Sequence, residues 1–169
     1  MNRIKLSKNF YLDEFTRSQT AVRAGIVVEV AQPSMEFVYL QELCEKVLQP
    51  LRDALGPVQI TSGYRPPALN KLIGGSPRSQ HQVGQAADIV VTGYTPLQVA
   101  RWIAENIPGY DQLIHEFGEW VHVSISGLHS KGRRQVLTAY KKKSRIPGRR
   151  PKTVYVPGLF ALSDLPEAA

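Results

Sequence analysis

The stretch SQHQVGQAAD occupies residues 79–88, and a second stretch, EFGEWVH, occupies residues 116–122. Together they bring two histidines, one aspartate and two glutamates into two short segments of the chain. Two imidazoles and one carboxylate are a common ligand set for a zinc ion that keeps one position open, and a nearby glutamate can serve such an ion as a general base. The two stretches therefore suggest a metal-dependent hydrolase.

The spacing within the first stretch requires a bend. His81 and Asp88 are too far apart to be neighbours on one helical turn or in one pleat of a strand. Gly84 lies between them and can adopt backbone angles that are closed to other residues. A bend at Gly84 would let a following strand, residues 85–91, carry Asp88 back towards His81.

The second stretch runs into an alternating segment, WVHVSI, at residues 120–125. A period of two places Trp120, His122 and Ser124 on one face of a strand and the three apolar residues on the other. We expect the apolar face to lie against the core and His122 to lie on the side where a cleft can form. Taken singly, a histidine or aspartate in a strand also fits an ordinary hydrogen-bonded structural residue, so the combination carries the inference.

Four ordered blocks between Val58 and Ser126 resemble the zinc D-Ala-D-Ala carboxypeptidases. The blocks are ITSGYRPPALN at 60–70, GGS at 74–76, Ser79-x-His81-x-x-Gly84-x-Ala86-x-Asp88, and Trp120-x-His122. The same superfamily contains D-Ala-D-Ala dipeptidases, the L-alanyl-D-glutamate endopeptidases of phage lysins, and the zinc-bearing amino-terminal domain of hedgehog proteins. The resemblance implies that His81, Asp88 and His122 hold Zn2+ and leave a fourth position for water.

Two acids compete for the role of catalytic base. Glu116 lies six residues before His122, which is similar to the hedgehog spacing, and Glu119 lies three before it, which is similar to the dipeptidase spacing. If Phe117 and Gly118 form the tip of a hairpin, counting back from His122 by twos reaches Glu116 and puts Glu119 on the opposite face. We therefore prefer Glu116, and Glu119 remains the alternative.

Arg65 and Ser79 are the candidate substrate-binding residues. Arg65 follows a short strand and Gly63 and precedes two prolines, so its position is held by rigid neighbours. The resemblance implies that this arginine binds the substrate or polarises the scissile carbonyl, and a permanently charged guanidinium suits both roles. Ser79 is expected to orient His81 or to contact the substrate.

Periodicity predicts an α+β fold with a small antiparallel sheet backed by helices. The resemblance implies a zinc site in a cleft on this sheet, as in hedgehog and D-Ala-D-Ala peptidases. An apolar stripe from Leu40 to Leu55, with Ser34 as N-cap, predicts one helix. Thr95, followed by proline and then Gln98, predicts a second helix that begins with a capping box. Short strands are expected near 58–60, 87–91, 112–116 and 120–125.

Composition limits the possible function classes. The 169 residues suit one domain, and no apolar run is long enough to span a membrane. Cys44 is the single cysteine, which excludes an internal disulfide and a cysteine zinc cluster. The first residues are basic but no apolar stretch follows, so we expect no classical signal peptide. We expect a cytoplasmic product that acts at the cell wall after holin-type release or as a virion component.

The chain divides by character into a helical lead-in at 1–30, a peptidase core at 31–130 and a basic extension at 131–169. Residues 121–162 contain no acid and account for most of the net charge of +7. The basic residues of this segment are Lys131, Arg133, Arg134, Lys141, Lys142, Lys143, Arg145, Arg149, Arg150 and Lys152. The extension is expected to be exposed, either to attract an anionic wall polymer or simply to remain solvated. Residues 154–156 are candidates for a strand that folds back on the core.

The favoured function is therefore a zinc peptidase on peptidoglycan stem peptides, either a D-Ala-D-Ala carboxypeptidase or an L-Ala-D-Glu-type endopeptidase, of phage or prophage origin. We expect it to act as a monomer. The alternative is a non-catalytic zinc-bearing module that binds the wall or a polyanion. Nucleic-acid binding is disfavoured, because it leaves both histidine stretches unexplained and because only Tyr140 is interleaved with the tail's charges.

Overall fold

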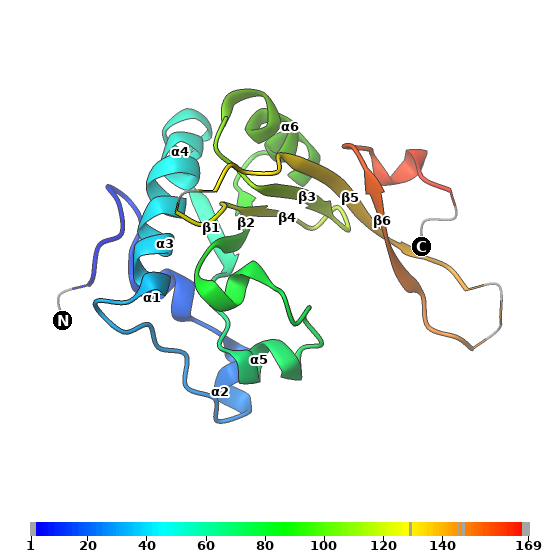
Figure 1. The fold of residues 1–169 in the computed structure, drawn as a ribbon. Helices are drawn as coiled ribbons and strands as arrows, with labels where there is room; N and C mark the ends of the chain where they lie inside the picture. Colours follow the sequence, from blue (N-terminus) through cyan, green and yellow to red (C-terminus); the bar gives the residue numbers. More distant parts are fainter. Residues whose placement is uncertain (1–2, 129, 145, 147, 167–169) are drawn as a thin grey trace.

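A six-stranded sheet forms the centre of the computed structural model, which describes residues 3–128, 130–144, 146 and 148–166 (Figure 1). The strands are β1 (Val58–Ser62), β2 (Ala86–Val91), β3 (Gln112–Glu116), β4 (Trp120–Ser124), β5 (Gln135–Lys142) and β6 (Lys152–Pro157). The α-helices are α1 (Leu12–Thr16), α2 (Gln19–Arg23), α3 (Met35–Leu43), α4 (Gln49–Leu55), α5 (Pro67–Leu72) and α6 (Pro96–Asn106). The other helical segments are the π-helix η1 (Cys44–Leu48) and the 3-10 helices η2 (Gln80–Val83) and η3 (Leu162–Asp164). The predicted α+β class is confirmed.

The strand order is β1-β2-β4-β3-β5-β6, and the sheet is mixed. Four neighbouring pairs are antiparallel, as expected, whereas β3 and β5 are parallel. β5 is parallel to β3 because the chain leaves β4 at the end of the sheet where β3 begins, goes past β3 and enters β5 at that same end. β5 was not expected from the sequence, whereas β6 contains the predicted strand at 154–156.

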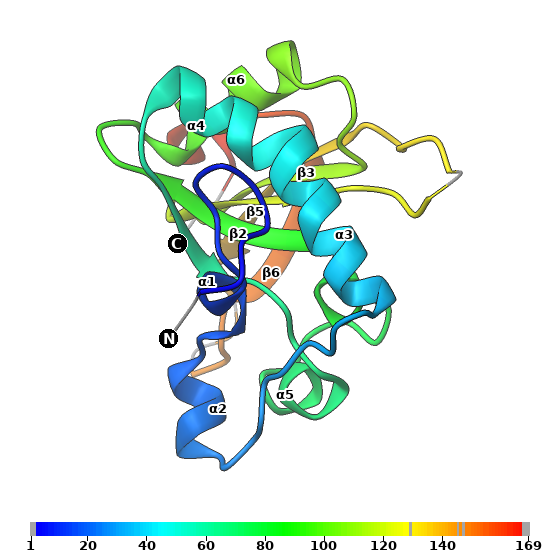
Figure 2. The same cartoon turned by 90° about the vertical axis from the view of Figure 1, so that its left-hand side faces the viewer.

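Both predicted helices are present with their predicted starts. The Ser34 hydroxyl accepts a hydrogen bond from the Phe37 amide at 3.2 Å, and α3, η1 and α4 continue from there to Leu55. Figure 2 shows α3 and α4 as one rod crossing in front of the strands. The Thr95 hydroxyl and the Gln98 side chain form the capping box of α6.

The helices bury one face of the sheet. α6 packs against β2, β3 and β4, and the apolar residues of α3, η1 and α4 join the same core cluster. Ala87, Ile89, Val121 and Val123 contribute to this cluster from the strands. Because side chains alternate along a strand, Asp88 and His122 project from the other face. In Figure 1, α6 lies above the sheet and α5 lies below it.

The lead-in helices are packed against the segment that follows β1. Phe10 and Phe15 are fully buried, and the Tyr64 amide donates a hydrogen bond to the Phe15 carbonyl at 2.8 Å. A Cβ atom at Gly63 would lie 2.5 Å from the Phe15 Cα, so this contact requires a glycine. Within the described ranges, the helices lack the combination of length and apolar character needed to cross a bilayer.

Candidate metal centre

Three potential metal ligands from three elements converge on the face of the sheet opposite the helical core. His81 lies in η2, Asp88 on β2, and His122 on β4 directly opposite Asp88 in the antiparallel register. Gly84 has a φ of 75°, which makes the bend that the sequence predicts between His81 and Asp88. The three side chains are buried, and their candidate ligand atoms lie within 4.8 Å of one another.

Hydrogen bonding orients the two imidazoles. His81 Nδ1 donates to the Gly63 carbonyl at 2.7 Å, which leaves the Nε2 lone pair free to face the cluster. His81 Nε2 lies 3.2 Å from His122 Nδ1 and 3.2 Å from Asp88 Oδ1, and His122 Nδ1 lies 2.9 Å from the same carboxylate oxygen. Three atoms that can each offer a lone pair therefore face a common point.

The charge states of these groups suit a divalent cation. Burial opposes ionisation of Asp88, but the two neighbouring histidines outweigh burial and hold the pKa of its carboxyl well below the usual range. Burial lowers the pKa of His81, so its imidazole stays neutral at physiological pH. Two imidazoles and one carboxylate form a borderline donor set that Zn2+ accepts, and zinc ligation needs these deprotonated forms. The residues present therefore fit a zinc ion.

A cleft of about 740 Å³ opens over this cluster and contains Glu116 on the same side. The register pairs Glu116 with Trp120 and Ile114 with His122, so Glu116 and His122 share one face of the sheet. Trp120 Nε1 donates to Glu116 Oε2 at 2.9 Å. Burial, followed by the negative charge of Asp88, raises the pKa of Glu116. A carboxylate with a raised pKa is suited to accept a proton near neutral pH.

Glu119 lies outside the cleft lining, although it belongs to the same hairpin as Glu116. Phe117 and Gly118 have positive φ angles and form the tight turn that the sequence predicts. Glu119 is exposed at the end of this turn and is not among the residues that line the cleft. Of the two acids, Glu116 is the one that lies in the cleft with His81, Asp88 and His122.

Arg65 and Ser79 both line the cleft. Arg65 Nη2 lies 3.8 Å from Asp88 Oδ2, and the Arg65 amide donates to the His81 carbonyl at 3.1 Å. Arg65 Nε is buried and has no hydrogen-bond partner among the described residues. A buried guanidinium donor without a partner beside the cluster is available to an oxygen of a bound molecule. Ser79 is half-buried at the start of η2.

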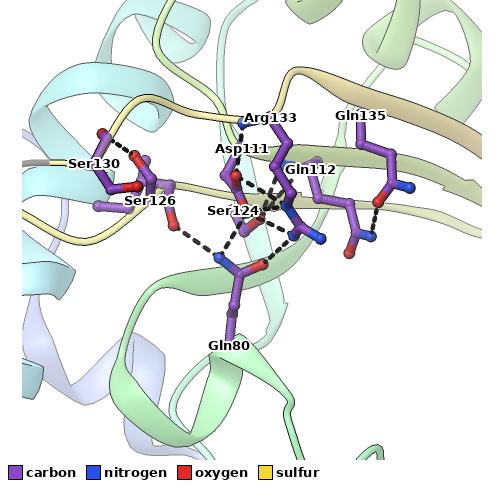
Figure 3. A network of polar contacts seen from close by, with 9 residues as sticks. Gln80, Asp111, Gln112, Ser124, Ser126, Ser130, Arg133 and Gln135 are labelled. Carbon is purple, nitrogen blue, oxygen red and sulfur yellow. Dashed lines mark hydrogen bonds and ion pairs between the residues drawn. The ribbon is translucent and has the colours of Figure 1, made fainter.

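Sequence reasoning missed a polar network that ties η2 to the segment before β5 (Figure 3). Gln80 Nε2 donates to Asp111 Oδ2 at 3.0 Å and to the Ile125 carbonyl at 2.9 Å. The Arg133 side chain donates to both oxygens of Asp111, and its Nη2 lies 2.6 Å from Oδ2. Because Gln80 directly precedes His81, the network helps to hold His81 in position. The network joins positions far apart in the chain, and no local sequence pattern predicts it.

Further cleft residues also lie outside the predicted set. Gln112 and Gln135 line the cleft and are joined by a hydrogen bond of 2.6 Å, and Tyr155 lines it from β6. His115, by contrast, is buried and outside the cleft lining, and its Nδ1 donates to the Phe160 carbonyl at 3.1 Å. Gln135 and Tyr155 reach the cleft only because β5 and β6 extend the sheet beside β3.

The fold and the buried His-Asp-His cluster define an α+β protein of the hedgehog and D-Ala-D-Ala peptidase-like class with a candidate metal site. The profile of the family described as Peptidase M15 matches residues 8–124, well over half of the chain. The chain therefore belongs to the Peptidase M15 family, whose members are zinc-dependent. A comparison with curated proteins gives no match.

Proposed function

We propose that this chain is a zinc metallopeptidase that hydrolyses peptide bonds in peptidoglycan stem peptides. The observation that carries the proposal is the buried His81, Asp88 and His122 cluster with Glu116 in the same cleft, in a chain that belongs to a zinc-dependent peptidase family. The proposed metal ligands are His81 Nε2, His122 Nδ1 and an oxygen of Asp88. Zinc in such a site supplies a polarised water and a Lewis acid for a peptide carbonyl.

Glu116 is the proposed general base. Trp120 engages Oε2, so we expect the other carboxylate oxygen, Oε1, to take the proton of the attacking water. Glu116 then returns that proton to the leaving amine. Its raised pKa supports both halves of this exchange, because the carboxyl can hold a proton between the two steps.

Arg65 is proposed to donate hydrogen bonds to the scissile carbonyl or to a substrate carboxylate. Its unpartnered Nε and its distance of 3.8 Å from Asp88 support this role, since the guanidinium is already desolvated beside the cluster. Ser79, on the rim of η2, is proposed to contact the substrate backbone. Glu119 is the weaker candidate for the base because it is exposed outside the cleft lining.

The test is mass spectrometry of purified muropeptides after incubation with zinc-loaded protein, with a chelator-treated sample alongside. New fragments that are lost on chelation are expected. A loss of terminal D-Ala would identify a carboxypeptidase, and cleavage between L-Ala and D-Glu would identify an endopeptidase. Intact muropeptides from several wall types, with protein shown to contain zinc, would instead favour the non-catalytic wall-binding module.

The exposed basic residues of the loop between β5 and β6 are proposed to attract an anionic wall polymer. The described cations of this loop, Lys143, Arg149 and Arg150, are exposed, as is Lys152 at the start of β6, and Arg145 lies outside the described residues. Binding of this kind weakens as salt rises. We expect co-sedimentation with walls that falls with salt and with removal of anionic polymers, whereas salt-independent binding would contradict the role.

Phage or prophage lysis is the proposed setting, tested by host lysis on co-expression with a holin.

A further inference from the structure

The β5–β6 hairpin brings one side chain to the Glu116 end of the cleft. Glu116 on β3 pairs with Trp120 on β4 and with Ala139 on β5, and Ala139 pairs with Tyr155 on β6. Residues paired across a sheet project from the same face. Trp120, Glu116, Ala139 and Tyr155 therefore form one row across four strands, on the face that also carries His122.

Ala139 leaves room for Tyr155 to approach Glu116. A methyl group fills little of the space above the sheet, and Ala139 is fully buried between its two larger neighbours in the row. The Tyr155 side chain lines the cleft together with Glu116, Asp88 and His122, and the residue is 53% exposed. Tyr155 thus borders both the cleft and the surrounding solvent.

The electrostatics keep the phenol protonated. Burial, followed by the negative charges of Glu116 and Asp88, raises the pKa of Tyr155. A protonated phenol at neutral pH is a hydrogen-bond donor, and the cleft already contains two carboxylates that can only accept. Tyr155 would therefore add a neutral donor on the side of the cleft opposite Arg65.

The hairpin that carries Tyr155 is firmly attached to the rest of the sheet. Thr138 Oγ1 donates to the Gly158 carbonyl at 2.8 Å and accepts from the Phe160 amide at 3.0 Å. Lys141 Nζ donates to Thr153 Oγ1 at 2.7 Å and lies 4.6 Å from the centre of the Phe117 ring. These contacts fix the register of β6 beside β5 and connect the hairpin to the turn after Glu116.

We propose that the Tyr155 hydroxyl donates a hydrogen bond to the substrate peptide group as it is hydrolysed. β5 and β6 lie beyond residues 8–124, so this group comes from outside the region that matches the family profile. The inference rests on the proposed peptidase function. It adds to the reaction a residue supplied by the basic C-terminal segment.

The test compares Tyr155→Phe with Tyr94→Phe, using steady-state kinetics on the muropeptide that the wild type cleaves. Tyr94 is exposed in the turn before α6 and outside the cleft lining, so its variant controls for loss of a tyrosine hydroxyl. We expect kcat of Tyr155→Phe to fall about 10- to 100-fold, with KM changed less than about threefold, because the hydrogen bond strengthens as charge develops. Zinc content and melting temperature should match the wild type.

Each outcome bears on a different claim. A Tyr155→Phe variant with wild-type kcat would overturn the role of Tyr155 and leave the peptidase function intact. A fall in kcat accompanied by lost zinc or a lowered melting temperature would also overturn it, because the tyrosine would then act on the structure. A zinc-loaded wild type that cleaves no muropeptide would overturn the proposed function itself, and the role of Tyr155 with it.

Discussion

Glu116 and Glu119 sit on one hairpin, three residues apart, and differ in their position relative to the cleft. Glu116 shares a face with His122, accepts a hydrogen bond from Trp120 and has a raised pKa. Glu119 is exposed beyond the turn. Counting by twos from His122 separates the two residues in the sequence, because the turn residues Phe117 and Gly118 keep both strands in register.

Glu116→Gln is expected to retain zinc and to lose about 10²- to 10⁴-fold in kcat, because the amide cannot accept the proton. The measurement is turnover of a muropeptide at equal zinc content. Glu119→Gln, the matched control on the same hairpin, should keep activity within about twofold of the wild type. Full activity in Glu116→Gln together with loss in Glu119→Gln would make Glu119 the base.

Gly63→Ala tests the backbone carbonyl that orients His81. The new Cβ would lie 2.5 Å from the Phe15 Cα, so the chain must shift there. We expect a loss of about 1–3 kcal/mol in unfolding free energy from overpacking. We also expect zinc affinity about 10- to 100-fold weaker, because the carbonyl that holds His81 Nδ1 moves.

Gly109→Ala is the control for this substitution, since its Cβ would meet nothing within 4 Å. Urea unfolding and competitive zinc titration measure both effects. Unchanged zinc affinity in a destabilised Gly63→Ala protein would show that the Gly63 carbonyl does not control the ligand.

At the scale of elements, the sequence predicts β2, β3, β4, α3 and α6 well because each has a local pattern: alternation, an apolar stripe or a capping box. It does not predict β5, because that strand is basic at its end and is stabilised by parallel pairing with β3. The His81–Asp88–His122 cluster follows from the local patterns, since Gly84 and the β2–β4 register bring its members together. The positions of Arg133 and Tyr155 in the cleft cannot be predicted from local patterns, because they depend on β5 and β6.

The Asp111–Arg133 contact links the segment before β3 to the segment before β5, and it predicts acid sensitivity. Burial opposes ionisation of Asp111, but hydrogen bonds from Arg133 outweigh it and lower the pKa of the carboxyl. The unfolded chain therefore binds this proton more readily than the folded one. The contribution to stability is present above about pH 4 and is lost as pH falls through the lowered pKa of the folded state.

Asp111→Asn should cost about 1–3 kcal/mol of unfolding free energy at pH 7 and distinctly less at pH 3, because the unfolded wild-type chain then takes up a proton at this carboxyl. Urea unfolding of both proteins at the two pH values measures the difference. Asp13→Asn is the control, since Asp13 forms exposed ion pairs with Arg3 and Arg17 that solvent screens. A gap between Asp111→Asn and wild type that is as large at pH 3 would contradict the assignment.

For the whole molecule, we expect zinc binding and folding to be coupled, because the three proposed ligands come from η2, β2 and β4 and meet only in the folded chain. At free zinc about 100 times Kd, linkage adds about 2.7 kcal/mol to the stability. For a chain of this size, that corresponds to a rise of about 5–10 °C in melting temperature.

Calorimetry with and without zinc measures this rise. His122→Ala should lose it, together with activity, whereas His115→Ala, which removes a histidine on the opposite face of the sheet, should keep it. An equal rise in the wild type and in His122→Ala would mean that zinc binds elsewhere.

The most direct test of the central claim is anomalous diffraction at the zinc absorption edge from crystals of the zinc-loaded protein. The account predicts a strong peak in contact with His81 Nε2, His122 Nδ1 and a carboxylate oxygen of Asp88, open towards the cleft that contains Glu116. A zinc-loaded crystal with no peak among these three residues, or with its peak at another site, would contradict it.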